Sequence, residues 1–202
     1  MTDPETDAET HAALMRRLQA ERRAERRDKT LTGGLLIVHT GDGKGKSTAG
    51  FGMVMRCLGW GMRPGVVQFI KGKWKTGERQ YLGGILGDDY VVSGEGFTWD
   101  SQDHQADIAA AERGWAAARA MLTDPAFDLV LLDELNIALR YDHLPIDRVL
   151  ADLAARPAHQ HVCVTGRSAK PELIEAADLV TEFAAVRHPY REGYKAQKGV
   201  EF

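Results

Sequence analysis

The stretch LLIVHTGDGKGKST, residues 35–48, decides the fold. Its aliphatic start, Leu35–His39, predicts a short buried strand, and the glycines that follow predict a tight turn. A helix is expected next, from about Lys46 to Trp60. A glycine-rich turn between a strand and a helix points backbone N–H groups at phosphate oxygens, and the helix N-terminus adds a partial positive charge. The sequence therefore predicts a phosphate-binding loop, or P-loop, at this point.

Lys46 and Ser47 supply the chemistry of this loop. The lysine brings a mobile cation to the phosphates and is the first candidate catalytic residue, and the serine hydroxyl is suited to Mg²⁺. In the strict GxxxxGK[ST] spacing the first glycine would fall at position 40, which is Thr40. A glycine-rich turn without a ligand is the alternative, and the strand–helix context disfavours it. The candidate nucleotide-binding residues of the loop are Thr40, Gly41, Asp42, Gly43, Lys44, Gly45, Lys46, Ser47 and Thr48.

Outward from the loop, short aliphatic runs alternate with helical segments. Continuous aliphatic strands separated by helices are typical of a parallel sheet covered on both faces. The sequence therefore predicts an α/β protein with a three-layer P-loop NTPase (RecA-like) fold and a mostly parallel central sheet of about six strands. Further strands are expected at 66–70, 90–93, 129–133, 161–165 and 179–183, and helices at 103–122, 135–141, 146–155 and from Pro171 onward.

Two acids end one of these strands. Leu129–Asp133 is followed by Glu134, in the arrangement known as Walker B. Mg²⁺ prefers hard oxygen ligands and is usually held by one or two carboxylates together with phosphates. The carboxyl end of a strand beside the P-loop would place such oxygens in the crevice where open α/β sheets bind ligands. A buried strand that ends at a helix cap is the alternative.

The first thirty residues differ from the rest of the chain. We predict a flexible, partly helical N-terminal arm over residues 1–33 and a P-loop domain over residues 34–202. Met1–Thr10 is polar and acidic, and we expect it to be disordered, whereas His11–Lys29 has a strongly basic, helix-forming composition. Either this segment is a solvated arm, or it folds over the nucleotide or a partner subunit with its positive side facing anions.

Composition excludes several classes of protein. The net charge of -3 gives no support for nucleic-acid binding, which usually needs a basic excess. Cys57 and Cys163 form no CxxC motif and lie in apolar stretches, so we expect reduced core residues. No apolar run reaches the roughly 18–20 residues that span a bilayer, and the polar N-terminus is unlike a secretory signal. The default expectation is a cytoplasmic protein without a membrane partner.

The segments that decide between P-loop enzymes lie between residue 30 and the C-terminus. They are TGDGKGKSTAGFG (40–52), VQFIKGKW (67–74), GER (77–79), GEGFTW (94–99), LLDELN (131–136), YDHLP (141–145), VTGR (164–167) and HPYREGYKAQKGVEF (188–202). Taken in order, these segments resemble the bacterial corrinoid adenosyltransferases of the CobA/CobO/BtuR type.

This resemblance implies a transfer of the 5′-deoxyadenosyl group of ATP to the cobalt of a reduced Co(I) corrinoid, with release of triphosphate. Co(I) would itself be the nucleophile, so the protein would position the substrates and stabilise charge on the triphosphate. Lys46, the loop amides, Mg²⁺ and Lys44 are available for that role. The resemblance also implies a triphosphate bound in reverse relative to ordinary P-loop hydrolases, a homodimer, and an electron donor such as a flavoprotein reductase for Co(II).

The same resemblance assigns roles to residues of this chain. Ser47 and Glu134 would be the ligands of Mg²⁺ (or Mn²⁺), and Arg167, which follows a strand, would contact phosphate. Phe97 and Trp99 match an aromatic pair that helps to remove the lower axial ligand of the corrinoid, and both are candidate catalytic residues. Core packing is the alternative for this pair, since aromatic side chains usually bury their area for stability.

Two positions depart from the family pattern. Asp42 stands where the family commonly has Asn, which adds a negative charge near the phosphates, and Ser47 stands in place of Thr, which keeps the hydroxyl. Lys71, Lys73 and Trp74 follow the second strand and could reach the nucleotide or the corrinoid, with a solvated loop as the alternative.

Two other functions remain open from the sequence. A P-loop kinase or ATPase would release ADP and would need a base near the γ-phosphate, for which Glu134 is available. A RecA-like nucleic-acid-binding module would fit the sheet pattern and the basic arm, but the acidic net charge and the lack of a basic–aromatic surface pattern disfavour it.

Overall fold

The computed structural model describes residues 4–70, 75–94 and 104–202, and divides the chain into two compact units, Met1–Thr32 and Gly33–Phe202. The first unit contains helix α1 (Pro4–Arg27), on which Leu14, Met15 and Leu18 are exposed. Because α1 begins at Pro4, the expectation that Met1–Thr10 is disordered is wrong from that residue on. The predicted roles of the arm stay predictions.

The second unit is built around a parallel sheet. Among the described residues the sheet has six strands in the order β3-β2-β4-β5-β1-β6, and every neighbouring pair is parallel. The predicted fold class is thereby confirmed. The strands are β1 (Leu36–Thr40), β2 (Pro64–Gln68), β3 (Tyr90–Val92), β4 (Leu129–Asp133), β5 (His161–Thr165) and β6 (Leu179–Glu182).

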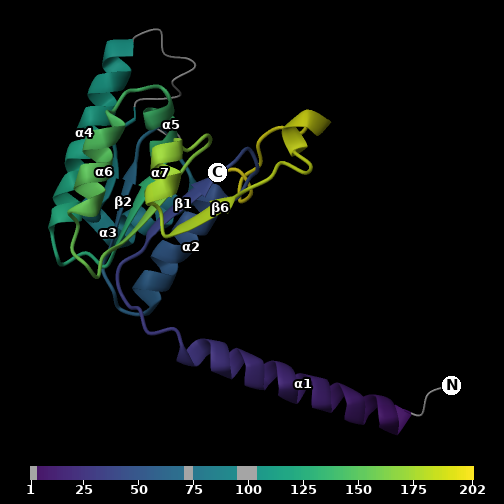
Figure 1. Cartoon of the computed structure of the whole chain (residues 1–202). Helices are drawn as coiled ribbons and strands as arrows, with labels where there is room; N and C mark the ends of the chain where they lie inside the picture. Colours follow the sequence, from purple (N-terminus) through teal and green to yellow (C-terminus); the bar gives the residue numbers. More distant parts are fainter. Residues whose placement is uncertain (1–3, 71–74, 95–103) are drawn as a thin grey trace. The chain divides into compact units, whose positions relative to one another are not determined.

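Helices cover both faces of the sheet, as Figure 1 shows. Alternate strand residues point to opposite faces, so each face has its own core. Val38, Val130 and Val162 pack against one helical layer, and Ile37, Leu131 and Cys163 pack against the other. The first layer contains α4 (His104–Thr123), α5 (Leu135–Arg140), α6 (Ile146–Ala154) and α7 (Pro171–Ala176), and the second contains α2 (Lys46–Gly59) and α3 (Gly77–Leu86). The described part of the unit also contains the short 3-10 helices η1 (Gly87–Asp89) and η2 (Pro189–Glu192).

The sequence analysis did not predict α3. Gly77, Gly83 and Gly84 lie in this helix, and glycine lowers helix propensity enough to hide it from a pattern search. Thr76 caps the helix by accepting a hydrogen bond from the Arg79 N–H at 3.3 Å, and Leu82 anchors it in the core. The Thr76 cap and the buried Leu82 therefore stabilise α3, although its glycines weaken the helical pattern in the sequence.

The carboxyl ends of the parallel strands meet at one edge of the sheet. In the register, Thr40 pairs with Glu182, Gln68 pairs with Asp133, and His39 pairs with Thr165. Polar side chains thus gather where the aliphatic runs end, which is the edge where open α/β sheets bind ligands. In the parts of the chain that the structure describes, no helix is both long and apolar enough to cross a membrane.

Both cysteines are buried and free, as predicted. Burial, reinforced by the negative charge of Asp128, raises the pKa of the Cys57 thiol to about 11. Burial likewise raises the pKa of the Cys163 thiol to about 12, with Asp133 adding to the effect. Since only the thiolate is nucleophilic, neither side chain is suited to covalent chemistry near neutral pH.

We therefore expect both thiols to resist a disulfide reagent such as 5,5′-dithiobis(2-nitrobenzoate) in the native protein at pH 8. Both should react at once in denaturant, and slow native reaction should begin at Cys57, which is 6% exposed, before Cys163, which is 0% exposed. Stoichiometric labelling of either thiol within the mixing time of the native protein would contradict this account of the core.

Candidate nucleotide-binding site

At each glycine of the predicted P-loop, a side chain would be disfavoured either by the backbone conformation or by close packing. Gly41 and Gly45 have φ angles of 92° and 107°, which lie in the left-handed region that glycine adopts without strain. Gly43 instead lies against backbone, because a Cβ placed on it would be 2.6 Å from the Ala184 carbonyl oxygen. The Gly43 N–H donates to the Phe183 carbonyl at 2.6 Å. The loop is thereby fixed against the chain that leaves β6.

Lys46 lies inside the loop that it follows. Its Nζ donates to the carbonyl oxygens of Gly41 at 2.7 Å and Gly43 at 2.6 Å, and the residue is only 8% exposed. Burial lowers the pKa of Lys46, and the negative charge of Glu134 opposes that effect. The positive charge of Arg167 lowers the same pKa further. Glu134 and Arg167, two predicted site residues from other segments, therefore lie close enough for their charges to act on the Lys46 ammonium.

The two acids at the end of β4 have different surroundings. Asp133 is fully buried, and its oxygens accept hydrogen bonds from Gln68 Nε2 and from Thr165 Oγ1, both at 2.8 Å. Glu134 is half-buried and adopts a left-handed φ of 63° at the start of α5. The Asp133 carboxylate therefore binds side chains of the two neighbouring strands. Of the two acids, Glu134 is the one whose negative charge raises the pKa of Lys46.

The donor set fits a magnesium ion only in company with phosphate. Within residues 4–70, 75–94 and 104–202, no group of three or more His, Cys, Asp or Glu side chains could hold a metal. Glu134 offers a carboxylate, the half-buried Ser47 offers a hydroxyl, and the buried Oδ1 of Asn136 has no hydrogen-bond partner among the described residues. Such oxygens are the kind that Mg²⁺ takes, with the rest supplied by water and phosphates.

The segment after β5 completes this edge. Gly166 has a φ of 129°, and a Cβ on it would lie 3.2 Å from Glu134 Oε2 and 2.8 Å from Asn136 Cβ. Arg167 follows and is exposed. Thr40 Oγ1 accepts a hydrogen bond from the Ala169 N–H at 3.0 Å. The threonine that replaces the strict first glycine thus ties the segment bearing Arg167 to the end of β1.

The remaining loop residues face outward. Asp42, Lys44 and Thr48 are exposed, and Lys44 pairs with Glu201 of the C-terminal segment. The predicted segment KAQKGVEF (195–202) is therefore brought to the P-loop. Asp42 acts on Lys46 by raising its pKa, against the main effect of burial.

Several predicted site residues lie outside the described ranges. These are Phe97 and Trp99 of the aromatic pair, and also Lys71, Lys73 and Trp74. The described residues that precede the two segments come together, because a Cβ on Gly94 would lie 2.5 Å from the Phe69 carbonyl oxygen and 2.7 Å from Ile70 Cα. Phe69, Ile70 and Gly94 therefore lie together at the carboxyl edge of the sheet.

Sequence reasoning missed the residues that support this site from neighbouring strands. Gln68, Thr165, Gly166 and Asn136 were assigned no role, although all four fall in quoted family segments. Their contacts depend on which strands are adjacent in the sheet, which no local pattern records. A glycine directly after a predicted strand was the one available signal, since it indicates a close approach or a turn.

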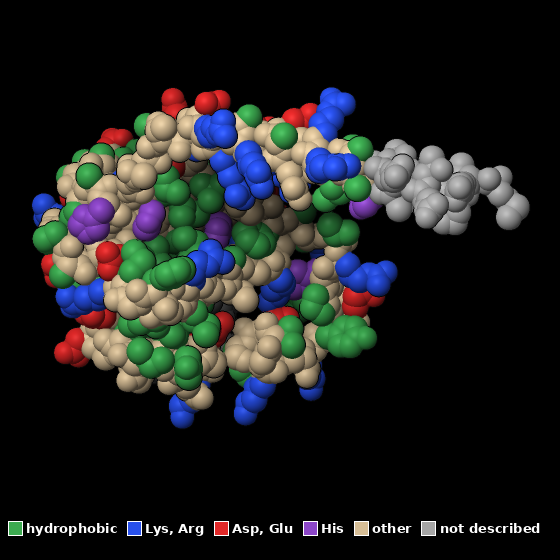
Figure 2. All heavy atoms as spheres, turned by 90° about the horizontal axis from the view of Figure 1, so that it is seen from below, with side chains coloured by type: hydrophobic (Ala, Val, Ile, Leu, Met, Phe, Trp, Pro, Cys, Tyr) green, Lys and Arg blue, Asp and Glu red, His purple; other side chains and the backbone are tan. Residues whose placement is uncertain are grey.

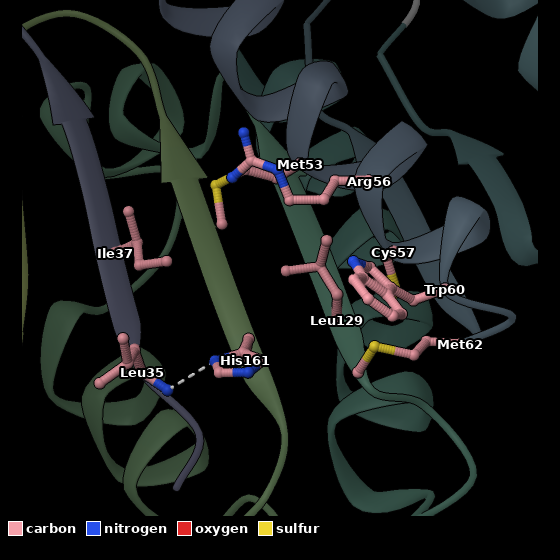
Figure 3. A pocket seen from close by; sticks show the side chains of 9 residues that line it. All are labelled: Leu35, Ile37, Met53, Arg56, Cys57, Trp60, Met62, Leu129 and His161. Carbon is pink, nitrogen blue, oxygen red and sulfur yellow. Dashed lines mark hydrogen bonds between the residues drawn. The ribbon is translucent and has the colours of Figure 1, made fainter. Parts of the chain in front are cut away.

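An open apolar groove of about 230 Å³ lies at the opposite edge of the sheet. Figure 3 shows its lining, which comes from the beginnings of β1, β4 and β5, from Leu35 before β1, from the second half of α2, and from Trp60 and Met62 after that helix. Figure 2 views the molecule from below relative to Figure 1. On the surface that faces the viewer, hydrophobic side chains lie next to Lys and Arg side chains. The groove is separate from the P-loop, because the strands that link the two edges run between them.

Comparison with known proteins agrees with the geometry. The family described as ATP:corrinoid adenosyltransferase BtuR/CobO/CobP matches residues 32–202. The corrinoid adenosyltransferase of Pseudomonas aeruginosa is 55% identical over 203 residues, which cover 98% of each chain. The corrinoid adenosyltransferase CobA of Salmonella typhimurium is 46% identical over 169 residues, covering 84% of this chain and 86% of the relative.

The packing of Gly43 gives a test of the loop. Gly43→Ala should push the loop away from Ala184 and lower the affinity for ATP by about tenfold or more, because phosphate contacts depend on backbone position. The matched control is Gly52→Ala in α2, where a Cβ would meet no atom of the described residues within 4 Å. The control should bind normally and melt slightly higher. Equal ATP affinity of the two variants, measured by calorimetric titration, would contradict the predicted role of the loop.

Proposed function

Because the chain belongs to the ATP:corrinoid adenosyltransferase family BtuR/CobO/CobP, we propose that it transfers the 5′-deoxyadenosyl group of ATP to the Co(I) centre of a reduced corrinoid and releases triphosphate. The structural observation that supports this most is the ammonium of Lys46 inside the glycine loop, with charged side chains of other segments around it. The reaction serves the biosynthesis or salvage of adenosylated cobalamin.

The proposed step breaks one bond and forms one. Electrons of Co(I) form the bond to C5′, and the electrons of the C5′–O5′ bond leave with the triphosphate. The protein therefore needs no nucleophile of its own, and the raised pKa values of the two buried thiols agree with this. Its contribution is to hold C5′ in line with the cobalt and to stabilise charge on the leaving group.

Lys46 is the residue best placed to stabilise the negative charge on the leaving triphosphate. Its present partners are two carbonyls of its own loop, and a triphosphate in the loop would offer oxygens with a greater negative charge. Lys44 and Arg167 add positive charge at the mouth of the site. We assign ATP binding to the loop residues 40–48 with Arg167, and leaving-group stabilisation to Lys46.

Glu134 and Ser47 are the proposed protein ligands of Mg²⁺, for which Mn²⁺ could substitute. The ion would supply further neutralisation of the triphosphate. Glu134 is supported in this role by its electrostatic effect on Lys46, and Ser47 by its place directly after Lys46 at the start of α2.

Phe97 and Trp99 keep their proposed role against the lower axial ligand of the corrinoid. A four-coordinate Co(II) corrinoid is easier to reduce to Co(I), and apolar side chains that exclude an axial donor favour that state. Both residues lie outside the described ranges, and their role rests on the family motif.

Partners and location belong to the same proposal. Reduction of Co(II) needs an electron donor, for which we propose a flavoprotein reductase. A homodimer is supported by the exposed Leu179 and Val180 of β6, the last strand in the sheet order. We also propose a cytoplasmic location, with which the two free, buried cysteines agree.

The direct test is an anaerobic incubation with MgATP and chemically reduced cob(I)alamin. We expect light-sensitive adenosylcobalamin and triphosphate in equal amounts. Lys46→Ala should lower the rate by about 100-fold or more, which is typical for loss of a group that stabilises a leaving anion. The control is Arg63→Ala, which removes a cation paired with Asp89 at the other edge of the sheet and should leave the rate near that of the wild type. Formation of ADP with an unaltered corrinoid would refute the transferase.

A further inference from the structure

Four adjacent strands are joined by one chain of side-chain hydrogen bonds at the carboxyl edge of the sheet. The Tyr90 hydroxyl donates to Gln68 Oε1, and Gln68 Nε2 donates to Asp133 Oδ2, both at 2.8 Å. Thr165 Oγ1 donates to Asp133 Oδ1 at 2.8 Å and accepts from the Glu134 N–H at 3.0 Å. The chain follows the order β3-β2-β4-β5 and ends on the backbone of Glu134.

The direction of each bond is fixed by its neighbours. Both oxygens of Asp133 accept, so the Gln68 amide turns its nitrogen toward Asp133 and its oxygen toward Tyr90. The Thr165 hydroxyl gives its only hydrogen to Asp133, which leaves a lone pair for the Glu134 N–H. Burial raises the pKa of Tyr90, and the charge of Asp133 raises it further, so this hydroxyl stays a donor.

These bonds hold a residue in an unusual conformation. Glu134 has a φ of 63°, which disfavours side chains with a Cβ and persists only where the surroundings impose it. Its N–H is held by Thr165, and its carbonyl accepts from the Ile137 N–H at 3.1 Å, in the first turn of α5. Gly166 leaves space beside the carboxylate, since a Cβ there would lie 3.2 Å from Oε2.

The central members of the chain are sealed from solvent. Gln68 is 1% exposed, and Asp133 and Thr165 are 0% exposed. Buried polar groups that satisfy one another define one arrangement, and loss of one member leaves the others without a partner. These buried hydrogen bonds therefore hold the backbone of Glu134 in a fixed position relative to the sheet.

We propose that Thr165 and Gln68 are positioning residues that set the direction of the Glu134 carboxylate, Thr165 directly and Gln68 through Asp133. This inference rests on the proposed role of Glu134 as a metal ligand. It adds that the affinity for Mg²⁺ depends on side chains that do not touch the ion. Partners that orient a metal ligand typically contribute about 10- to 100-fold to metal affinity.

The test measures ATP binding by calorimetry with and without Mg²⁺, in the absence of a corrinoid. Thr165→Val keeps the shape of the side chain but removes the hydroxyl, and it should reduce the Mg²⁺-dependent gain in ATP affinity by about tenfold or more. ATP binding without Mg²⁺ should change little. Thr165→Ser restores the hydroxyl and should restore most of the gain. In turnover, Thr165→Val should need more Mg²⁺ for half-maximal rate, while kcat at saturating Mg²⁺ changes less.

A second pair of variants separates positioning from stability. Gln68→Leu removes the amide that supports Asp133, and Gln160→Leu removes an equally buried amide that donates to Met121, Asp124 and Phe127 at the other edge of the sheet. Both should lower the melting temperature. Only Gln68→Leu should weaken the response to Mg²⁺, and this comparison holds even if Thr165→Val does not fold.

Three results would overturn the inference. The first is a normal Mg²⁺ response in both Thr165→Val and Gln68→Leu. The second is a Thr165→Ser variant as impaired as Thr165→Val, and the third is an equal loss in Gln160→Leu and Gln68→Leu. Because no corrinoid is present, a wild-type protein that fails to make adenosylcobalamin would refute the proposed function without affecting this readout.

Discussion

The two hydrogen bonds from the Lys46 ammonium to the carbonyls of Gly41 and Gly43 are the interaction on which the site depends. They close the loop around its own cation, so its shape does not rely on a bound phosphate. A buried ammonium is costly unless it is paired, which is why burial lowers the pKa of Lys46 and why the nearby Glu134 charge matters. The loop in turn rests on the backbone of Phe183–Ala184. A substrate with a charged triphosphate suits a site that already holds a buried cation in place.

The parallel sheet explains how distant segments meet at this cation. Each strand ends at the same edge, and each contributes a different group there: the P-loop after β1, Glu134 after β4, and Arg167 after β5. The buried bonds between Gln68, Asp133 and Thr165 cross the strands and fix their relative positions. A reaction whose nucleophile belongs to the substrate needs this kind of protein, which orients and neutralises without reacting.

Much of this could be predicted from sequence because the signals are local. Leu129–Leu132 is a continuous aliphatic run, and the strands Leu129–Asp133 and His161–Thr165 both have the predicted bounds. Gly41–Gly45 lies between β1 and α2 and forms the expected loop. Helix α3 was missed because its glycines weaken the pattern, and the role of Thr165 was missed because it depends on β4 and β5 being neighbours. The roles of the Thr40 hydroxyl and of Gly166 could not be predicted for the same reason. They depend on contacts with residues distant in the sequence, Ala169 for Thr40 and Glu134 and Asn136 for Gly166.

The central claim is that the bond broken in ATP is C5′–O5′ rather than a P–O bond. The most direct measurement is a reaction of reduced corrinoid with ATP that carries oxygen-18 at the 5′ bridging position, followed by mass spectrometry of the products. Attack by cobalt at C5′ predicts that the whole label leaves with triphosphate, and that the cobalt-bound adenosyl group has none. Label retained on an adenosine nucleotide such as ADP would show cleavage at phosphorus and would contradict the account.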